Sequence, residues 1–255
     1  MFGSGNVLCI FSVMKKVIFI TLLTIITLPT VGQNAENNAT SLSVGINLSP
    51  DIAYRNLESS SSVGSLKEEP KFGYTGGVNL KYNVTPRFSL EAGAQYSNKG
   101  YAFKNSELIY ADMIDPRYGF VYQNVGDAPT HLRRIYNFHY FDIPVRGIFS
   151  FGKNKISFLA SAGITTNILL KTTTTSILEY KGGKKEKKNQ EYPYDFRKIN
   201  ISLIVSAGIN YKINDKFNIS AEPTFRYGIL KITDAPVTAF LWNAGMNVSC
   251  YYVLK

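Results

Sequence analysis

The side chains best suited to electrostatic chemistry are charged residues that interrupt segments of otherwise alternating apolar and small polar residues. Successive side chains of a β-strand point to opposite faces, and this alternation assigns seven such charges to the same, polar face. They are Lys81, Glu91, Asp142, Arg146, Lys212, Glu222 and Arg226. A buried charge without a partner is costly, so four bases and three acids in one interior are expected to neutralise one another. The sequence therefore predicts an ion-pair network, and the alternative is a narrow conduction path, because rings of charge also set pore selectivity.

Catalytic and metal chemistry find little support in the sequence. His131 and His139 are the only histidines, and the chain contains no G-x-S-x-G or H-E-x-x-H motif. A hydrolase or acyltransferase needs a base within hydrogen-bond reach of a nucleophile, and nothing places a serine and a carboxylate beside His139. Cys9 and Cys250 are too few for a zinc cluster or a disulfide framework. We therefore expect no enzyme activity, no cofactor and no metal site.

Two polar stretches carry residues suited to binding a partner. The stretch Lys181-Gly-Gly-Lys-Lys-Glu-Lys-Lys188 holds five lysines and one glutamate. Clustered lysines attract anions such as lipopolysaccharide phosphates or an acidic surface protein, although such a run is also typical of a solvated loop tip. Residues 104–134 contain aromatic side chains among aspartates, and aromatics on a long loop commonly serve recognition. The candidate surface-binding residues are Tyr110, Tyr118, Phe120, Tyr122, Lys184, Lys185, Lys187 and Lys188.

The elements that must position these side chains are β-strands. The chain of 255 residues contains 17 tyrosines, 16 phenylalanines and 20 glycines but one tryptophan and four methionines, a mixture that favours pleated sheet. Beyond about Ser41 the dominant period is two, and residues 74–84 show an apolar face and a polar face in strict alternation. The pattern predicts strands at residues 41–54, 72–84, 88–103, 135–151, 156–174, 197–213, 217–230 and 238–254.

The connections between these segments alternate in length. Three are tight turns, at residues 85–87, 152–155 and 214–216. The others are longer, near residues 55–71, 104–134, 175–196 and 231–237. Short turns at one end and long loops at the other are typical of an outer-membrane barrel with its turns in the periplasm. We therefore predict an all-β fold, an eight-stranded antiparallel up-and-down transmembrane β-barrel with both termini periplasmic.

A soluble lipocalin-like carrier is the alternative eight-stranded barrel, and the direction of the apolar face separates the two. In a soluble barrel the large apolar residues lie inside, whereas a membrane barrel turns them towards lipid. The apolar faces here end in aromatics such as Tyr74, Tyr82 and Phe88, as in interfacial girdles, while the opposite faces carry mainly Gly, Ser, Asn and Thr. We therefore favour the membrane barrel, and because an eight-stranded interior is normally filled by side chains we expect no open pore.

The first residues are typical of an export signal. From Met14 the chain reads Met-Lys-Lys, then an apolar run over residues 17–28, then a polar segment. The run is shorter than the roughly 20 residues that span a bilayer as a helix. We predict a signal peptide over residues 1–32, with Met14 as the true start, and an outer-membrane barrel domain over residues 33–255. The formal net charge of +10 is scattered along the chain, and an exported barrel is not expected to bind nucleic acid.

The combined pattern resembles the small outer-membrane β-barrel proteins of Bacteroidetes called PorT-like, over about Ser41 to Lys255. The segment Tyr140-Phe-Asp-Ile-Pro-Val-Arg146 resembles the tyrosine-x-x-isoleucine-proline segment that opens the fourth strand in that family. The ending Tyr251-Tyr-Val-Leu-Lys255 departs from the usual terminal aromatic. The resemblance implies the fold and the outer membrane, and for most members no established activity.

The function expected from these observations is a structural or loop-mediated binding role. We predict a monomer in contact with outer-membrane lipid and lipopolysaccharide, with a possible protein partner on the long loops. The alternatives are an accessory barrel of a protein secretion system, a role held by one PorT-like member, and the soluble carrier.

Overall fold

The computed structural model describes the part of the chain that forms the predicted barrel. The described residues are 41–57, 67–105, 113–114, 121–122, 129–152, 155–180, 183–191, 196–233 and 239–254. All of them belong to one compact unit, Thr40–Lys255. The predicted signal peptide and Met14 lie outside the described residues.

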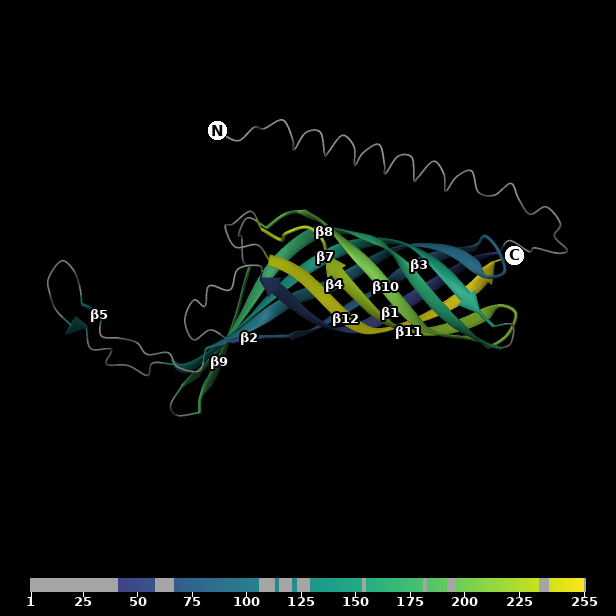
Figure 1. Ribbon diagram of the computed structural model, residues 1–255. Coiled ribbons are helices and arrows are strands. Elements are labelled where there is room, and N and C mark those ends of the chain that lie inside the picture. The colour runs from purple at the N-terminus through teal and green to yellow at the C-terminus, as the bar shows by residue number, and fades with distance from the viewer. Residues whose placement is uncertain are drawn as a thin grey trace, which may run out of the picture. The chain divides into compact units, whose positions relative to one another are not determined.

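Eight long antiparallel strands form a closed ring (Figure 1). They are β1 (Leu42–Leu57), β3 (Lys71–Asn83), β4 (Phe88–Asn105), β7 (Pro129–Phe151), β8 (Ile156–Tyr180), β10 (Ile199–Lys212), β11 (Phe217–Gly228) and β12 (Ala239–Leu254). Each strand pairs with the next, and the pairing of β12 with β1 and of β8 with β10 completes the circle. The predicted eight-stranded up-and-down barrel is therefore confirmed.

The two faces of the barrel wall differ in the way that a membrane requires. On β3, Val78 and Leu80 leave 53% of their surface exposed on the outside, whereas Thr75 and Asn79 retain at most 1% on the inside. This apolar exterior and polar interior is the inverse of a soluble barrel, so the lipocalin-like alternative is wrong. Among the described residues, no helix has the length and apolar character needed to cross a bilayer.

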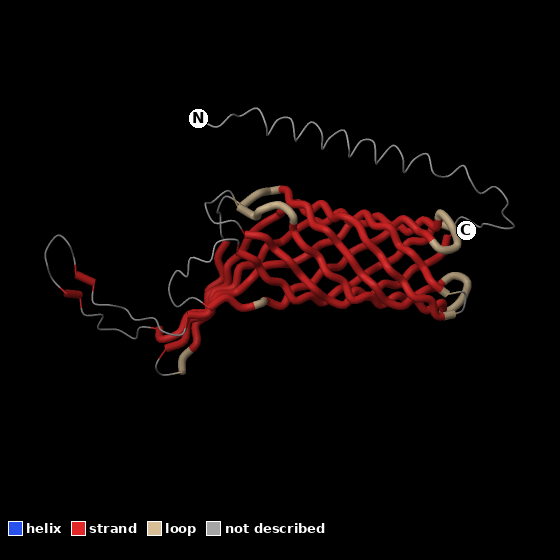
Figure 2. Tube along the Cα trace, viewed as in Figure 1, coloured by secondary structure: helices blue, strands red, loops and turns tan. Residues whose placement is uncertain are grey.

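The three tight turns lie at one end of the barrel, which we call the turn end. Thr85 Oγ1 accepts hydrogen bonds from the backbone N–H groups of Arg87 and Phe88, and Asn214 Oδ1 does the same for Lys216 and Phe217. These side chains hold the turns in place. The barrel begins and ends here as well, because Leu42 pairs with Leu254 (Figure 2).

At the opposite end, the loop end, the wall continues beyond the ring as an open sheet. The predicted loops 104–134 and 175–196 are wrong in part, because β7 already begins at Pro129 and β8 runs on to Tyr180. A further strand, β9 (Lys185–Glu191), pairs with β8, and β2 (Lys67–Glu69) pairs with β4. We call β2, β9 and the adjoining ends of β4, β7 and β8 the loop-end sheet. Two short strands, β5 (Met113–Ile114) and β6 (Val121–Tyr122), pair only with each other.

A β-bulge in β8 marks where the loop-end sheet begins. The register between β7 and β8 shifts between His139 and Tyr140, so that Leu170 has no partner on β7. Consequently Leu170 and Lys171, although consecutive, are both exposed. The two prolines within strands, Pro144 and Pro223, lie in continuous register, opposite Thr165 and Met246. The ladder is only interrupted on one side of each proline, because the ring nitrogen carries no hydrogen to donate.

A cluster of aromatic and aliphatic side chains packs inside the loop end. Its buried members are Tyr101, Tyr136, Phe138, Tyr140, Ile232, Ala239 and Leu241, with Phe103, Leu169 and Phe196 packed against them. The rings of Phe138 and Phe196 meet edge to face with centroids 4.8 Å apart. Because the members come from β4, β7, β8 and β12, we infer that the cluster spans the interior from one wall to the other.

Candidate functional site

The barrel interior brings together five of the seven charges that alternation assigned to it. Glu91, Asp142, Arg146, Glu222 and Arg226 each retain no more than 3% of their surface. They come from β4, β7 and β11, and each takes part in a hydrogen-bonded cluster.

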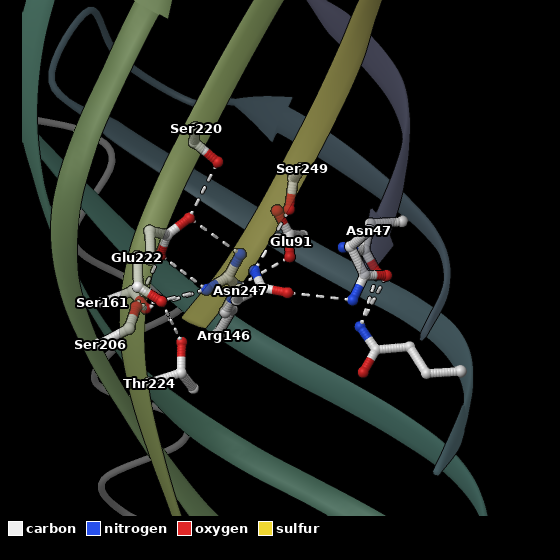
Figure 3. Close-up of polar contacts among 12 residues, drawn as sticks. Asn47, Glu91, Arg146, Ser161, Ser206, Ser220, Glu222, Thr224, Asn247 and Ser249 are labelled. Atoms are coloured by element: carbon white, nitrogen blue, oxygen red, sulfur yellow. Dashed lines mark hydrogen bonds and ion pairs between the residues drawn. The ribbon is translucent and has the colours of Figure 1, made fainter. Parts of the chain in front are cut away.

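The central cluster is built on the guanidinium of Arg146 (Figure 3). Its Nε donates to Glu91 Oε1 at 2.7 Å and its Nη1 donates to Glu222 Oε2 at 2.9 Å. The Ser206 hydroxyl donates to Glu222 at 2.6 Å, and the Tyr251 hydroxyl donates to Glu91 at 2.6 Å from the last strand. One arginine thus forms ion pairs with two carboxylates, and hydroxyls donate further hydrogen bonds to both of them.

The backbone of β8 makes room for this arginine. Gly163 lies directly opposite Arg146. A Cβ atom at Gly163 would stand 2.2 Å from the carbonyl oxygen of Val145 and 2.7 Å from Arg146 Cβ. Only glycine therefore fits at this close approach of the two strands.

A second cluster surrounds Asp51, a residue that the sequence interpretation did not single out. Its carboxylate accepts hydrogen bonds from Arg226 at 3.4 Å, Thr75 at 2.7 Å and Asn243 at 2.9 Å. The Ser49 hydroxyl donates at 2.6 Å from the same strand. Asp51 has the same parity as Asn47 and Ser49 on β1, so alternation alone could have found it.

A third cluster pairs Asp142 with Lys99, which was also missed. The ammonium of Lys99 lies 2.9 Å from Asp142 Oδ2. The Ser97 hydroxyl donates to the same carboxylate at 2.7 Å, and the Asn167 amide donates at 2.6 Å. Lys99 shares the parity of Glu91 on β4 and could have been assigned to the interior by the same rule.

The remaining two predicted members differ in their positions. Lys81 is half-buried beside the central cluster: it lies directly opposite Glu91, and its Nζ stands 5.4 Å from the ring centre of Tyr251. Lys212 is exposed at the turn end and pairs with Asp215 at 2.9 Å, so the structure does not bring it into the network. Lys212 is the last residue of β10, where an inward parity no longer leads to a buried position. The hydrogen bond from Lys212 and the positive charge of its ammonium lower the pKa of the fully exposed Asp215 carboxyl.

Neither histidine lies in the interior clusters. The Nδ1 atom of His139 is hydrogen-bonded to the Tyr96 hydroxyl, and its Nε2 lies 3.3 Å from Thr173 Oγ1. His131 is exposed on the loop-end sheet. Within the described ranges, no group of three or more His, Cys, Asp or Glu side chains could hold a metal ion.

The structure places the predicted surface residues unevenly. Tyr110, Tyr118 and Phe120 lie outside the described residues, and of Tyr122 only the backbone, in β6, is described. Lys184, Lys185, Lys187 and Lys188 are exposed. The last three belong to β9, so the interpretation of this lysine run as a loop tip is wrong for them, whereas Lys184 precedes the strand. The run could not be recognised as a strand because its charge masks any alternation.

Comparison with known proteins decides the family. Residues 32–234 match the family model described as the outer membrane protein beta-barrel domain. The chain belongs to this family. It is therefore an outer-membrane β-barrel protein, in agreement with the orientation of its apolar face. No curated protein sequence matches the chain.

Several solved outer-membrane barrels are similar in structure. Neisserial surface protein A is 16% identical, with 82% of this chain and 95% of that chain covered and a TM-score of 0.40. OprG from Pseudomonas aeruginosa is 9% identical, with 86% and 98% covered and a TM-score of 0.36. The protease OmpT from Escherichia coli is 10% identical, with 88% and 100% covered and a TM-score of 0.39.

Proposed function

We propose that this outer-membrane barrel is non-conducting and acts through its loop end, as a structural or binding protein. The observation that carries the proposal is the interior itself. Arg146 on β7 reaches Glu222 on β11, and Tyr251 on β12 reaches Glu91 on β4, so hydrogen bonds cross the lumen between strands that are not neighbours. Side chains tied together in this way leave the cross-section filled.

A second barrier supports the same proposal. The aromatic cluster at the loop end packs Phe138 and Tyr101 against Phe196 and Leu241, beyond the charged clusters along the strands. A solute crossing the barrel would have to displace both the ion pairs and this apolar packing. Each barrier alone opposes the passage of ions, because paired charges offer no free ligand and an apolar constriction excludes water.

Planar-bilayer recordings test whether the barrel conducts. Wild-type protein is expected to give no conductance steps, while a general porin inserted under the same conditions does. Discrete steps from the wild type that disappear or change size in Arg146→Ala would overturn the proposal.

The loop end is the part of the protein that would meet a partner. In outer-membrane barrels the long connections face outwards from the cell, and here the loop-end sheet extends that surface with the cationic strand β9. Lipopolysaccharide or a protein that recognises residues 104–134 would bind here. Deletion of residues 108–128 should leave the barrel inserted and abolish capture of a surface partner, and unchanged capture would reject a role for this segment.

We also propose a non-catalytic role and membership of the PorT-like group from Bacteroidetes. Both ring nitrogens of His139 are engaged, with Tyr96 and Thr173, and no carboxylate is among their partners. The segment that resembles the PorT-like motif forms the middle of β7 and supplies the interior with Asp142 and Arg146. Hydrolysis of a lipid or peptide by the wild type but not by His139→Ala would contradict the absence of catalysis.

A further inference from the structure

One row of side chains crosses the loop-end sheet on the face that continues the barrel interior. Phe103 on β4 pairs with Arg134 on β7, Arg134 pairs with Ser176 on β8, and Ser176 pairs with Lys188 on β9. Residues directly opposite on neighbouring strands point to the same face. Arg134 and Lys188 are therefore two cations on one face, separated by a single serine.

Several basic side chains of this region form ion pairs with acidic neighbours. Arg133 lies 3.3 Å from Glu69, Lys185 lies 3.5 Å from Glu179, and Lys188 lies 3.2 Å from Glu186. Arg55 forms an ion pair with Glu68 and covers the rings of Tyr101 and Phe103 at 4.1 and 4.7 Å. Among the described residues these four bases thus have acidic partners, whereas no ion pair is found for Arg134.

Two buried polar atoms on this face have no hydrogen-bond partner within the described part of the chain. They are Arg134 Nε and Thr174 Oγ1. Thr174 lies opposite Tyr136, two residues along β8 from Ser176, and so on the same face as Arg134. A buried polar atom without a partner is destabilising, and these two lie on the same face of neighbouring strands, where a group from outside the chain could complete them.

The side chains around these atoms define the chemistry of that group. An arginine fork and a lysine ammonium favour an oxyanion such as a carboxylate or a sulfate. Ser176, Thr174 and Gln190, which pairs with Thr174, add hydroxyl and amide groups that exchange hydrogen bonds with hydroxyls. Half-buried Phe103 offers an apolar edge beside the cation. Hydroxyls, an apolar ring face and an oxyanion occur together in acidic sugars.

We propose that this inner face of the loop-end sheet binds an acidic polysaccharide, with Arg134 and Lys188 holding its charged group and Thr174 and Ser176 its hydroxyls. The inference rests on the binding role proposed for the loop end and names its ligand class. Binding weakens as salt is added, because the lysine and the polymer charge are partly exposed.

The sheet supplies matched controls for the two cations. Arg133 and Lys187 are the immediate neighbours of Arg134 and Lys188 in sequence, but they point to the opposite, outer face. Substitution of either pair changes the net charge of the protein equally. General electrostatic attraction would therefore respond to all four positions, whereas a site on the inner face responds only to Arg134 and Lys188.

The experiment measures binding of polymers to the full-length barrel in detergent micelles. The probes are polygalacturonate for carboxylate, dextran sulfate for sulfate, neutral dextran, and polyglutamate as a peptide with the same charge. We expect one or both acidic polysaccharides to bind and the other two probes not to. Arg134→Gln and Lys188→Gln should weaken binding about tenfold or more, as loss of a charge-assisted hydrogen bond implies, while Arg133→Gln and Lys187→Gln stay within about twofold.

Each other outcome overturns the proposal. Equal losses at inner and outer positions would show nonspecific attraction, and binding of polyglutamate alone would assign the face to an acidic protein. Should Arg134→Gln not fold, judged by the shift in gel mobility on boiling, Arg134→Lys keeps the charge but loses the fork and is expected to weaken binding as well. The broader function stands separately, because bilayer conductance and deletion of residues 108–128 do not involve these positions.

Discussion

Arg146 on β7 and Glu222 on β11 stand three strands apart around the ring, yet Arg146 Nη1 lies 2.9 Å from Glu222 Oε2. The contact joins two walls of the barrel through its interior. Strand pairing does not predict this contact, because the register determines contacts between neighbouring strands only. The contact therefore shows that the interior is packed as a core of polar side chains.

Removal of the shared arginine should be strongly destabilising. Arg146→Ala leaves Glu91 and Glu222 buried without their shared ion-pair partner, and breaking a buried pair in this way costs about 3–5 kcal/mol. Urea unfolding in lipid vesicles, followed by the fluorescence of the single tryptophan, measures the loss. Lys212→Ala removes an exposed cation at the turn end and should change the free energy of unfolding by no more than about 0.5 kcal/mol. Similar losses in the two variants would contradict the paired interior.

Asp51 and Arg226 should be energetically coupled. Asp51→Asn alone leaves the buried guanidinium of Arg226 without its carboxylate, at a cost of about 3 kcal/mol or more. Arg226→Met in the same chain removes that unpaired charge, so the double variant should be more stable than the sum of the single losses predicts. A double-mutant cycle by urea unfolding measures the coupling. Strict additivity would show that the two side chains do not interact in the membrane.

A charged substitution on the lipid-facing side should destabilise the barrel more strongly the deeper it lies in the bilayer. Val78, near the middle of β3, is 53% exposed on the outside, and Val78→Arg should cost about 2–4 kcal/mol. Ile213 lies at the turn end, where Ile213→Arg should cost about 0–1 kcal/mol. Both variants are compared by urea unfolding in vesicles. Equal costs would mean that the apolar belt does not mark the position of the bilayer.

The β8–β9 hairpin should influence the titration of Glu186. The Tyr180 hydroxyl donates to Glu186 Oε2 at 2.9 Å, and this hydrogen bond, with the nearby Lys188, lowers the pKa of the carboxyl. A folded-state pKa below the unfolded value stabilises the fold above the unfolded pKa, and the contribution is lost as pH falls through the folded value. Tyr180→Phe should raise the pKa of Glu186 in a carbon-detected NMR titration. Tyr211→Phe, on the membrane-spanning wall, serves as the control and should leave it unchanged.

The two faces of the barrel were predictable because a strand has only one period. Once Leu80 is assigned to the outside, Asn79 must point inside, and the same rule would have added Asp51, Lys71 and Lys99 to the interior charges. The rule failed for Lys212, where the strand ends and parity no longer implies burial. Alternation also does not predict contacts across the lumen, such as that between Tyr251 and Glu91, because these depend on the curvature of the ring.

The loop-end sheet was missed for a different reason. The extra residue Leu170 reverses the parity of β8, so that Thr172 and Thr174 face inwards although Thr165 and Asn167 do so below the bulge. A single insertion of this kind leaves no mark in the composition. Strand β9 was also hidden, because five of its seven residues, the run Lys185-Glu-Lys-Lys188 and Glu191, are charged, and charge runs are typical of loops.

The hydrogen bond from Tyr251 to Glu91 also bears on how the barrel assembles. Tyr251 lies on β12, the strand that closes the ring, and so does Asn243, which completes the Asp51 cluster. If the chain were inserted only as far as β11, the carboxylates of Glu91 and Asp51 would lie in the bilayer without the hydrogen bonds that Tyr251 and Asn243 donate. Closure by β12 therefore supplies the missing hydrogen bonds at the moment the last two edges pair. Insertion is expected to be all-or-none, with no stable intermediate that has most of its strands in the membrane.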